Sequence, residues 1–146
     1  MTHMAAPKLS VKELEDLLCA EFPEMFNPQS GYAIEEIWHG GCRVRKRFDA
    51  QSLRPGGTIA GTAMMTLADF SIYVAILGTI GWVPLTVTTN LTINFLKKPA
   101  ARDLLGEVRL LKLGKRLAVG EIAIRSDGED ELVAHAISTY SIPPQR

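Results

Sequence analysis

The chain has 146 residues, the size of one ordinary domain, and its 47% hydrophobic and 22% charged residues are typical of a soluble globular protein. Sixteen Lys and Arg offset sixteen Asp and Glu, so the net charge gives no electrostatic reason to expect a nucleic-acid or membrane partner. We therefore expect a single domain over residues 1–146, with neither kind of partner.

The first predicted element is a short helix over residues 10–20. Ser10 is a candidate N-cap, and Glu13 stands at the spacing of a capping box. Prolines between residues 23 and 28 then end the helix.

Strands are predicted at residues 32–38 and 42–48, joined by a Gly-rich turn at residues 39–41. The second strand alternates, with one set of side chains apolar (Cys42, Val44 and Phe48) and the other basic (Arg43, Arg45 and Arg47). This pattern predicts one buried face and one solvated face.

A break at residues 53–57 precedes the most apolar element, a predicted helix over residues 59–77 that ends at Gly78. Apolar residues lie on almost every side of this helix, which is typical of a helix buried on most sides.

Four strands are predicted after this helix, at residues 86–96, 104–113, 117–125 and 131–142. The first alternates regularly, with Val87, Thr89, Leu91, Ile93 and Phe95 on one face and Thr86, Thr88, Asn90, Thr92 and Asn94 on the other. Six strands have to cover one helix that is apolar nearly everywhere. The pattern therefore predicts an α+β fold, with one antiparallel sheet wrapped around a central helix, and sheet edges left for a dimer partner.

Both cysteines, Cys19 and Cys42, lack CxxC spacing and His residues at metal-ligand intervals, so we expect free thiols in a reducing compartment. Residues 1–4 lack the features of a secretory signal. The most apolar stretch, residues 59–82, contains Asp69 and several Thr, which disfavours a membrane span. A cytoplasmic location is the resulting expectation.

The predicted central helix carries one narrow polar stripe, spaced by three or four residues: Thr58, Thr62, Thr66, Asp69 and Tyr73. An ionisable Asp69 on such a helix is costly unless it is paired or functional. It is therefore either a catalytic carboxylate or a core carboxylate satisfied by hydrogen bonds.

Glycines at positions 56, 57 and 61 lie at the start of this helix, where unpaired N–H groups and the helix dipole favour an oxyanion. These glycines alternatively serve only to turn the chain. Gly61 and Asp69 are separated by eight residues, about 12 Å along a helix. If both act on one carbonyl, Gly61 of one subunit has to face Asp69 of another, which predicts a symmetric homodimer with two shared sites.

The segments Gly57-Thr58-Ile59-Ala60-Gly61-Thr62 and Leu67-Ala68-Asp69 resemble hotdog-fold thioesterases of the phenylacetate-degradation type. The strand at residues 87–96 and the last strands, with Gly114-Lys115-Arg116 and Thr139-Tyr140, are also similar to that family, so the likeness covers residues 32–142. The resemblance implies a hotdog fold and hydrolysis of an acyl-CoA by a homodimer, or by a dimer of dimers.

By the same resemblance, Asp69 is the general base or nucleophile, Gly61 donates its N–H to the oxyanion, and Thr88 helps to place the attacking water. Thr62 stands at the second Gly of the family's His-Gly-Gly motif. Two other positions depart from the family: Arg54 replaces an Asn, and Ala60 replaces the His.

Binding of the substrate is assigned to further residues. Coenzyme A carries phosphates, so basic clusters at strand ends are candidates: Lys97 and Lys98 with Arg102, and Lys115 with Arg116. Ordinary solvated charges explain the same clusters. The full set of predicted substrate-binding residues is Arg54, Gly57, Thr66, Tyr73, Asn90, Lys97, Lys115 and Arg116.

The predicted function is hydrolysis of an acyl- or aryl-acyl-CoA. No metal or separate cofactor is expected, because coenzyme A belongs to the substrate and His3, His39 and His135 are isolated in sequence. A hydratase or dehydratase would need a His near the helix start, where Ala60 stands. The alternative from another class is a non-catalytic acyl-CoA-binding or regulatory protein.

Overall fold

The structure, a computed structural model, describes residues 5–145, with only the backbone of Ser52; the expectation about residues 1–4 lies outside the described residues. The elements in chain order are α1 (Val11–Glu21), β1 (Tyr32–Trp38), β2 (Gly41–Lys46), the 3-10 helix η1 (Ala50–Ser52), β3 (Leu53–Arg54), β4 (Thr58–Ile59), α2 (Gly61–Ile80), β5 (Val87–Phe95), β6 (Leu104–Leu113), β7 (Leu117–Ser126) and β8 (Leu132–Ser141).

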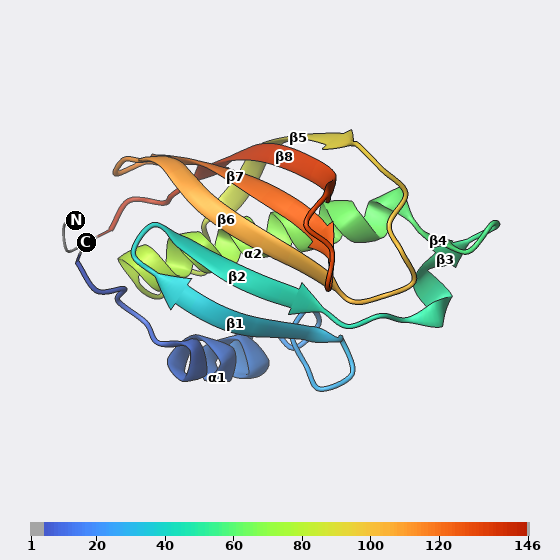
Figure 1. The fold of residues 1–146 in the computed structure, drawn as a ribbon. Helices are drawn as coiled ribbons and strands as arrows, with labels where there is room; N and C mark the ends of the chain where they lie inside the picture. The colour runs from blue at the N-terminus through green and yellow to red at the C-terminus, as the bar shows by residue number, and fades with distance from the viewer. Residues whose placement is uncertain (1–4, 146) are drawn as a thin grey trace.

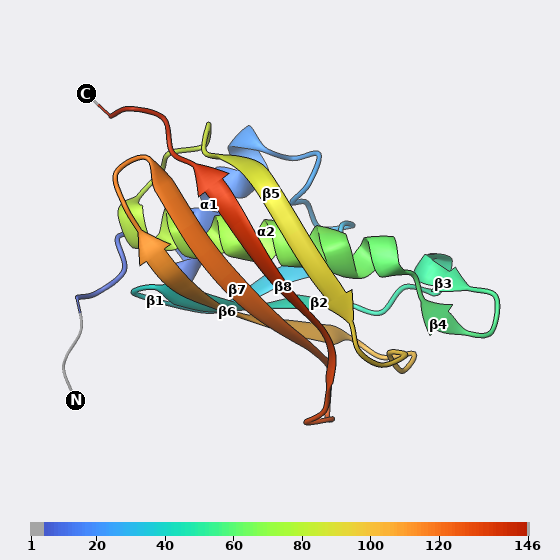
Figure 2. The same ribbon diagram turned by 90° about the horizontal axis from the view of Figure 1, so that it is seen from above.

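Six strands form one antiparallel sheet in the order β1-β2-β6-β7-β8-β5, and this sheet curves around α2 (Figures 1 and 2). The predicted wrapped sheet and its hotdog fold are confirmed. The short hairpin of β3 and β4 was not predicted; it stands beyond the sheet, beside the first turn of α2 (Figure 2).

Helix α1 packs beside β1, the strand at one edge of the sheet (Figure 1). Its predicted capping box is present: the Ser10 hydroxyl accepts from the Glu13 N–H, and the Glu13 carboxylate accepts from the Ser10 N–H. Leu14 and Leu18 are fully buried against the core. The Glu15 carboxylate accepts a 2.9 Å hydrogen bond from the Ile34 N–H, which ties α1 to β1.

Helix α2 is three residues longer at its C-terminal end than predicted. It runs through Gly78 and ends at Ile80, before Gly81 with φ of 106°. Gly78 serves a different purpose, because a Cβ there would lie 2.7 Å from Cγ2 of Ile37. The predicted stop was wrong because close packing, not the end of the helix, requires this glycine.

The start of α2 was also misplaced, since the helix begins at Gly61 and not at residue 59. Thr58 pairs with Arg54 in the hairpin of β3 and β4 and is therefore not part of the helical polar stripe. Helix α2 is long and apolar enough to cross a membrane. It is, however, the core helix of this fold, and 67% of its most apolar 18-residue stretch is buried.

Strand β2 buries Cys42 and Val44 completely, as predicted. Both cysteines are free thiols, and burial raises the pKa of Cys42.

The basic face of β2, which was predicted to be solvated, is instead largely covered by ion pairs. The Arg43 and Arg45 side chains are about 30% exposed, and both pair with Glu35 of β1. Carboxylates on the neighbouring strands and in the adjoining turns complete an ion-pair network around these arginines: Glu36, Asp103, Glu107 and Asp127.

The regular alternation predicted for β5 is interrupted by a β-bulge between Thr88 and Asn90. Thr88 pairs with Tyr140, whereas Asn90 pairs with Thr139. The extra residue at Thr89 changes the parity of the strand, so Thr88 faces α2 together with Leu91 and not together with Asn90. The predicted placement of Thr88 and Leu91 on opposite faces of the strand was wrong for this reason.

Candidate active site

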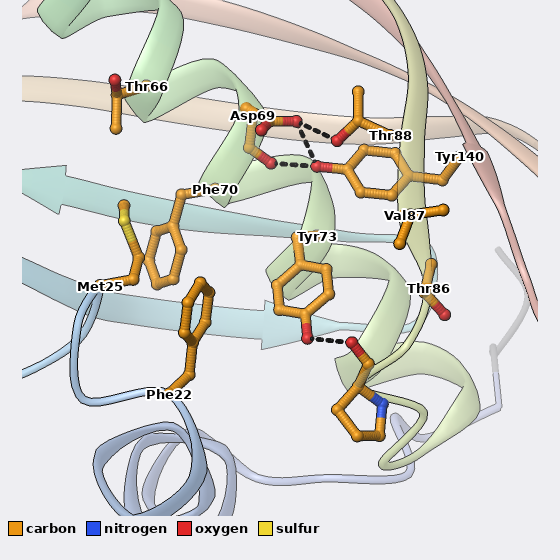
Figure 3. A pocket seen from close by; sticks show the side chains of 11 residues that line it. Phe22, Met25, Thr66, Asp69, Phe70, Tyr73, Thr86, Val87, Thr88 and Tyr140 are labelled. Atoms are coloured by element: carbon orange, nitrogen blue, oxygen red, sulfur yellow. Dashed lines mark hydrogen bonds between the residues drawn. The ribbon is translucent and has the colours of Figure 1, made fainter.

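Asp69 lies in the middle of α2, on the side of the helix turned toward β5 and β8 (Figure 3). One of its carboxylate oxygens, Oδ1, accepts hydrogen bonds from two hydroxyls, Thr88 Oγ1 at 2.7 Å and Tyr140 at 2.5 Å. The other oxygen, Oδ2, has no hydrogen-bond partner among residues 5–145. Hydrogen bonds therefore hold the carboxylate through Oδ1 and leave Oδ2 available to a ligand or to water.

Tyr140 was not predicted as a site residue. Its ring is only 2% exposed, and its hydroxyl lies 2.6 Å from the Asp69 carbonyl oxygen as well as next to Oδ1. Burial raises the pKa of Tyr140, and the Asp69 charge raises it further, so the phenol keeps its proton and donates a hydrogen bond to Asp69. Tyr140 stands directly opposite Thr88 in the pairing of β5 with β8, and this register is known only from the structure.

A cavity of about 420 Å³ adjoins the Asp69 carboxylate. Its lining is mostly apolar and aromatic: Phe22, Met25, Thr66, Asp69, Phe70, Tyr73, Pro84, Thr86, Val87, Thr88 and Tyr140 (Figure 3). An apolar cavity with one charged group at its wall is the usual form of a small-molecule site. Two residues predicted to bind substrate, Thr66 and Tyr73, lie on it.

Both of these hydroxyls already have acceptors within the chain. Tyr73 donates to the Pro84 carbonyl at 2.8 Å, and Thr66 donates to the Thr62 carbonyl at 3.0 Å. Tyr73 therefore offers the cavity its ring more than its hydroxyl, and the ring stacks on Tyr140 with centroids 6.3 Å apart.

A second hollow, of about 570 Å³, lies at the start of α2. Gly61, the first residue of the helix, lines it, and the N-cap residue Ala60 makes no side-chain cap, so the first-turn N–H groups receive no capping side chain. Phe95 of β5 covers Gly61 so closely that a Cβ there would lie 3.2 Å from its ring. The predicted oxyanion donor thus lies at an uncapped helix N-terminus, on the wall of this hollow and beside the Phe95 ring.

The two hollows are separate within one chain. Gly61 and Asp69 lie on the same unbroken helix, eight residues and so about 12 Å apart. Thr62 is exposed and lines neither hollow. The structure therefore brings Thr88, Tyr140 and Thr66 together with Asp69 and places Gly61 in the other hollow, so that each hollow is one half-site.

The predicted basic residues are divided between the two ends of the molecule. Arg54 and Lys97 line the hollow at Gly61, and Gly57 lies in the adjoining turn with φ of 78°. Lys97 is paired with Glu131 at 3.0 Å and with Glu129 at 3.6 Å. Residues 115–116 lie in the turn between β6 and β7, at the opposite end of the sheet (Figure 1).

Two remaining candidates lie on the outer face of the sheet, away from Asp69. The Asn90 side chain accepts a 3.5 Å hydrogen bond from Thr92 on this face. His135 pairs with Glu121 at 3.0 Å, and the hydrogen bond from His135 together with that from Arg109 lowers the pKa of Glu121. Across the described residues, no group of three or more His, Cys, Asp or Glu side chains could hold a metal ion.

Comparison with known proteins agrees with this architecture. A family model described as the thioesterase superfamily matches residues 56–133. The chain is 34% identical over 136 residues to a protein of Saccharolobus solfataricus named "putative esterase", which covers 93% of this chain and 87% of that protein. A solved structure from Silicibacter sp. TM1040, described as a "putative thioesterase", is 41% identical, covers 94% of both chains and has a TM-score of 0.85.

The phenylacetate-degradation type also appears among the similar structures. The phenylacetic acid degradation protein PaaI of Thermus thermophilus, solved as a point mutant, has a TM-score of 0.70 at 20% identity, covering 83% of this chain and 99% of its own. At that identity the likeness concerns the fold alone. It confirms the fold that the sequence resemblance implied.

Proposed function

This chain belongs to the thioesterase superfamily, and from that premise we propose that it hydrolyses the thioester of an acyl-CoA with Asp69 as the base or nucleophile. The observation that carries the proposal is the unequal bonding of the carboxylate. Thr88 and Tyr140 hold Oδ1, while Oδ2 has no partner among the described residues and the carboxylate borders an apolar cavity. Asp69 is only partly buried, and Oδ2 is not among the buried polar atoms that lack a partner, so this oxygen is accessible to water or to a ligand in the cavity.

The reaction needs only water as co-substrate. Asp69 Oδ2 takes a proton from a water molecule whose oxygen adds to the thioester carbonyl carbon; the carbon–sulfur bond then breaks, and the thiolate of coenzyme A leaves and is protonated. In the nucleophilic variant, Oδ2 itself attacks the carbon, and the carbon–sulfur bond breaks as the thiolate of coenzyme A leaves and is protonated. Water then hydrolyses the resulting anhydride and restores the Asp69 carboxylate. Both routes give a carboxylic acid and free coenzyme A.

The oxyanion formed at the carbonyl needs a donor that Asp69 cannot supply. Gly61 of the partner subunit fits this role, because a helix N-terminus favours developing negative charge. Within one chain Gly61 is too distant. A complete site is therefore proposed to form only between two copies of the chain.

Strand β5 provides the geometry for such a dimer. It lies at the edge of the sheet, and its two ends adjoin the two half-sites: Thr88 bonds Asp69, and Phe95 packs on Gly61. In an antiparallel pair of β5 strands, the Phe95 end of one lies beside the Thr88 end of the other. Gly61 of the partner subunit then approaches Asp69. Exposed apolar side chains at both ends of this edge, Val87, Phe95 and Leu96, support its burial in a dimer.

The phosphates of coenzyme A are proposed to bind at the hollow beside Gly61. Arg54 and Lys98 line it and make no ion pair within residues 5–145, whereas Lys97 is neutralised by Glu129 and Glu131. Arg54 and Lys98 are thus the cations most available to phosphate oxygens.

The test is thiol release from a panel of acyl-CoA substrates. Asp69→Asn should lower kcat by about 10²- to 10⁴-fold, because the amide can neither accept the proton nor attack. The exposed Asp130→Asn is the matched control and should leave kcat unchanged. If no substrate releases thiol although acyl-CoA binds tightly, the chain is instead an acyl-CoA-binding protein without turnover.

A further inference from the structure

We infer that Phe22 and Met25, in the loop after α1, form the wall that limits the length of the bound acyl chain. This inference rests on the proposed function, since it assigns the cavity beside Asp69 to the acyl group. Both residues precede the part of the chain that the family model matches. They line the cavity together with Phe70 and Tyr73, although they come from a segment more than 35 residues earlier in the chain.

The positions of the lining residues define a direction for the acyl chain. The reacting carbonyl must lie at Asp69, and Phe70 and Tyr73 follow on the same helix. Figure 3 shows Phe22 and Met25 across the cavity from Asp69, beyond the rings of Phe70 and Tyr73. Phe22 meets Tyr73 edge to face, with centroids 6.3 Å apart, so the rings close the far end together.

Phe22 lies at the boundary between the cavity and solvent, because it lines the cavity and is also 37% exposed. A cavity of about 420 Å³ is in the lower part of the range for small-ligand sites. An acyl chain of medium length fits within it, and a longer linear chain would meet Phe22. Removal of this ring would lengthen the space available to the acyl chain.

The loop itself does not depend on the Phe22 side chain. The Phe22 N–H donates to Leu18, and the Phe22 carbonyl accepts from the Met25 and Phe26 N–H groups. Phe26 is the anchor, since it is only 6% exposed and stacks on Phe70 at 6.0 Å. Substitution at Phe22 or Met25 therefore changes the wall while the backbone that carries it stays in place.

The experiment compares lauroyl-CoA with hexanoyl-CoA in matched variants. Phe22→Ala should raise the ratio of kcat/KM for lauroyl-CoA over hexanoyl-CoA by about tenfold, and Phe22→Trp should lower it, because one methylene of fit or clash in an apolar pocket is worth about tenfold or more. Met25→Ala should act like Phe22→Ala and covers the case in which a Phe22 variant fails to fold. Leu111→Ala, an exposed apolar truncation outside the cavity, should leave the ratio unchanged.

The same ratio is measured as binding constants in the Asp69→Asn background. This second readout separates the two proposals, because it does not require turnover. If wild type hydrolyses neither substrate but the binding ratio changes as described, the wall stands and the hydrolase proposal fails. If Phe22→Ala, Met25→Ala and Phe22→Trp all leave both ratios unchanged, the wall is disproved.

Discussion

Thr88 and Asp69 are joined by a 2.7 Å hydrogen bond that depends on a bulge in β5. The bulge turns Thr88 toward α2, in line with Tyr140 of the neighbouring strand, so that two hydroxyls converge on a single carboxylate oxygen. Bulges often re-aim a side chain beside an active site, and this one fixes which oxygen of Asp69 stays available.

Removal of the Thr88 hydroxyl should lower turnover more than binding. Thr88→Val retains the branched shape but not the donor, and kcat should fall about tenfold, as expected for one lost hydrogen bond to a charged group. Thr88→Ser keeps the hydroxyl and should retain most of the activity. Equal kcat values for the valine and serine variants would show that this bond does not position Asp69.

Tyr140→Phe should also lower kcat about tenfold with little change in KM, because the ring and its stacking on Tyr73 remain while the donor to Asp69 is lost. The free energy of unfolding should fall by about 1–2 kcal/mol in chemical denaturation. Since Thr88 and Tyr140 share one acceptor oxygen, the effects of Thr88→Val and Tyr140→Phe on kcat should be non-additive in a double-mutant cycle. Strict additivity would contradict a shared role.

Position 61 offers a clean test of the oxyanion donor. Gly61 is the first residue of α2, where proline is compatible with a helix but lacks the N–H. Gly61→Pro should therefore lower kcat by about 10²- to 10³-fold. Gly61→Ala adds the same Cβ against Phe95 but keeps the N–H, and it should retain most of the activity. Comparable losses in the two variants would attribute the effect to packing.

Mixed dimers test whether the site is shared between subunits. A heterodimer of one Asp69→Asn chain and one Gly61→Pro chain has one site with both defects and one with neither. Purified heterodimers, made by co-expression with two affinity tags, should recover about half of the wild-type kcat per dimer although both parent homodimers are nearly inactive. No recovery in a well-formed heterodimer would exclude the composite site.

The ion pairs on the outer face of the sheet should make the free energy of unfolding decrease at acid pH. Burial alone would raise the pKa of Glu35, but hydrogen bonds from Arg45 and Arg43 outweigh it and lower this pKa below its ordinary value of 4.5. Glu35 therefore stabilises the fold above its unfolded pKa, and this contribution is lost as the pH falls through the lower folded pKa.

Thermal unfolding between about pH 7 and pH 3 tests this linkage. Glu35→Gln should lower Tm at neutral pH and flatten the decline of Tm at acid pH relative to wild type. Glu36→Gln removes a more exposed carboxylate that makes one ion pair, and should change Tm little. An identical acid decline in wild type and Glu35→Gln would contradict the assignment.

The sequence by itself determined the main strands and the central helix, and it singled out Asp69 as the candidate catalytic carboxylate. Helix α2 has almost no polar side, so a sheet had to surround it, and Asp69 was conspicuous because a charge on such a helix requires a purpose. Eight residues of helix between Gly61 and Asp69 also fixed their separation, because helical rise is constant. These inferences depend only on local periodicity and composition.

The family resemblance had already assigned Thr88 to the Asp69 site, but only the tertiary structure decided how Asp69 is held. The bulge in β5 brings Thr88 to the same face as Leu91, against the predicted alternation, and Tyr140 reaches Asp69 from 71 residues along the chain. Phe22 lines the same cavity from a loop before the first strand. Contacts of this kind depend on strand register and on the packing of distant segments, and neither is encoded in the spacing of residues along one element.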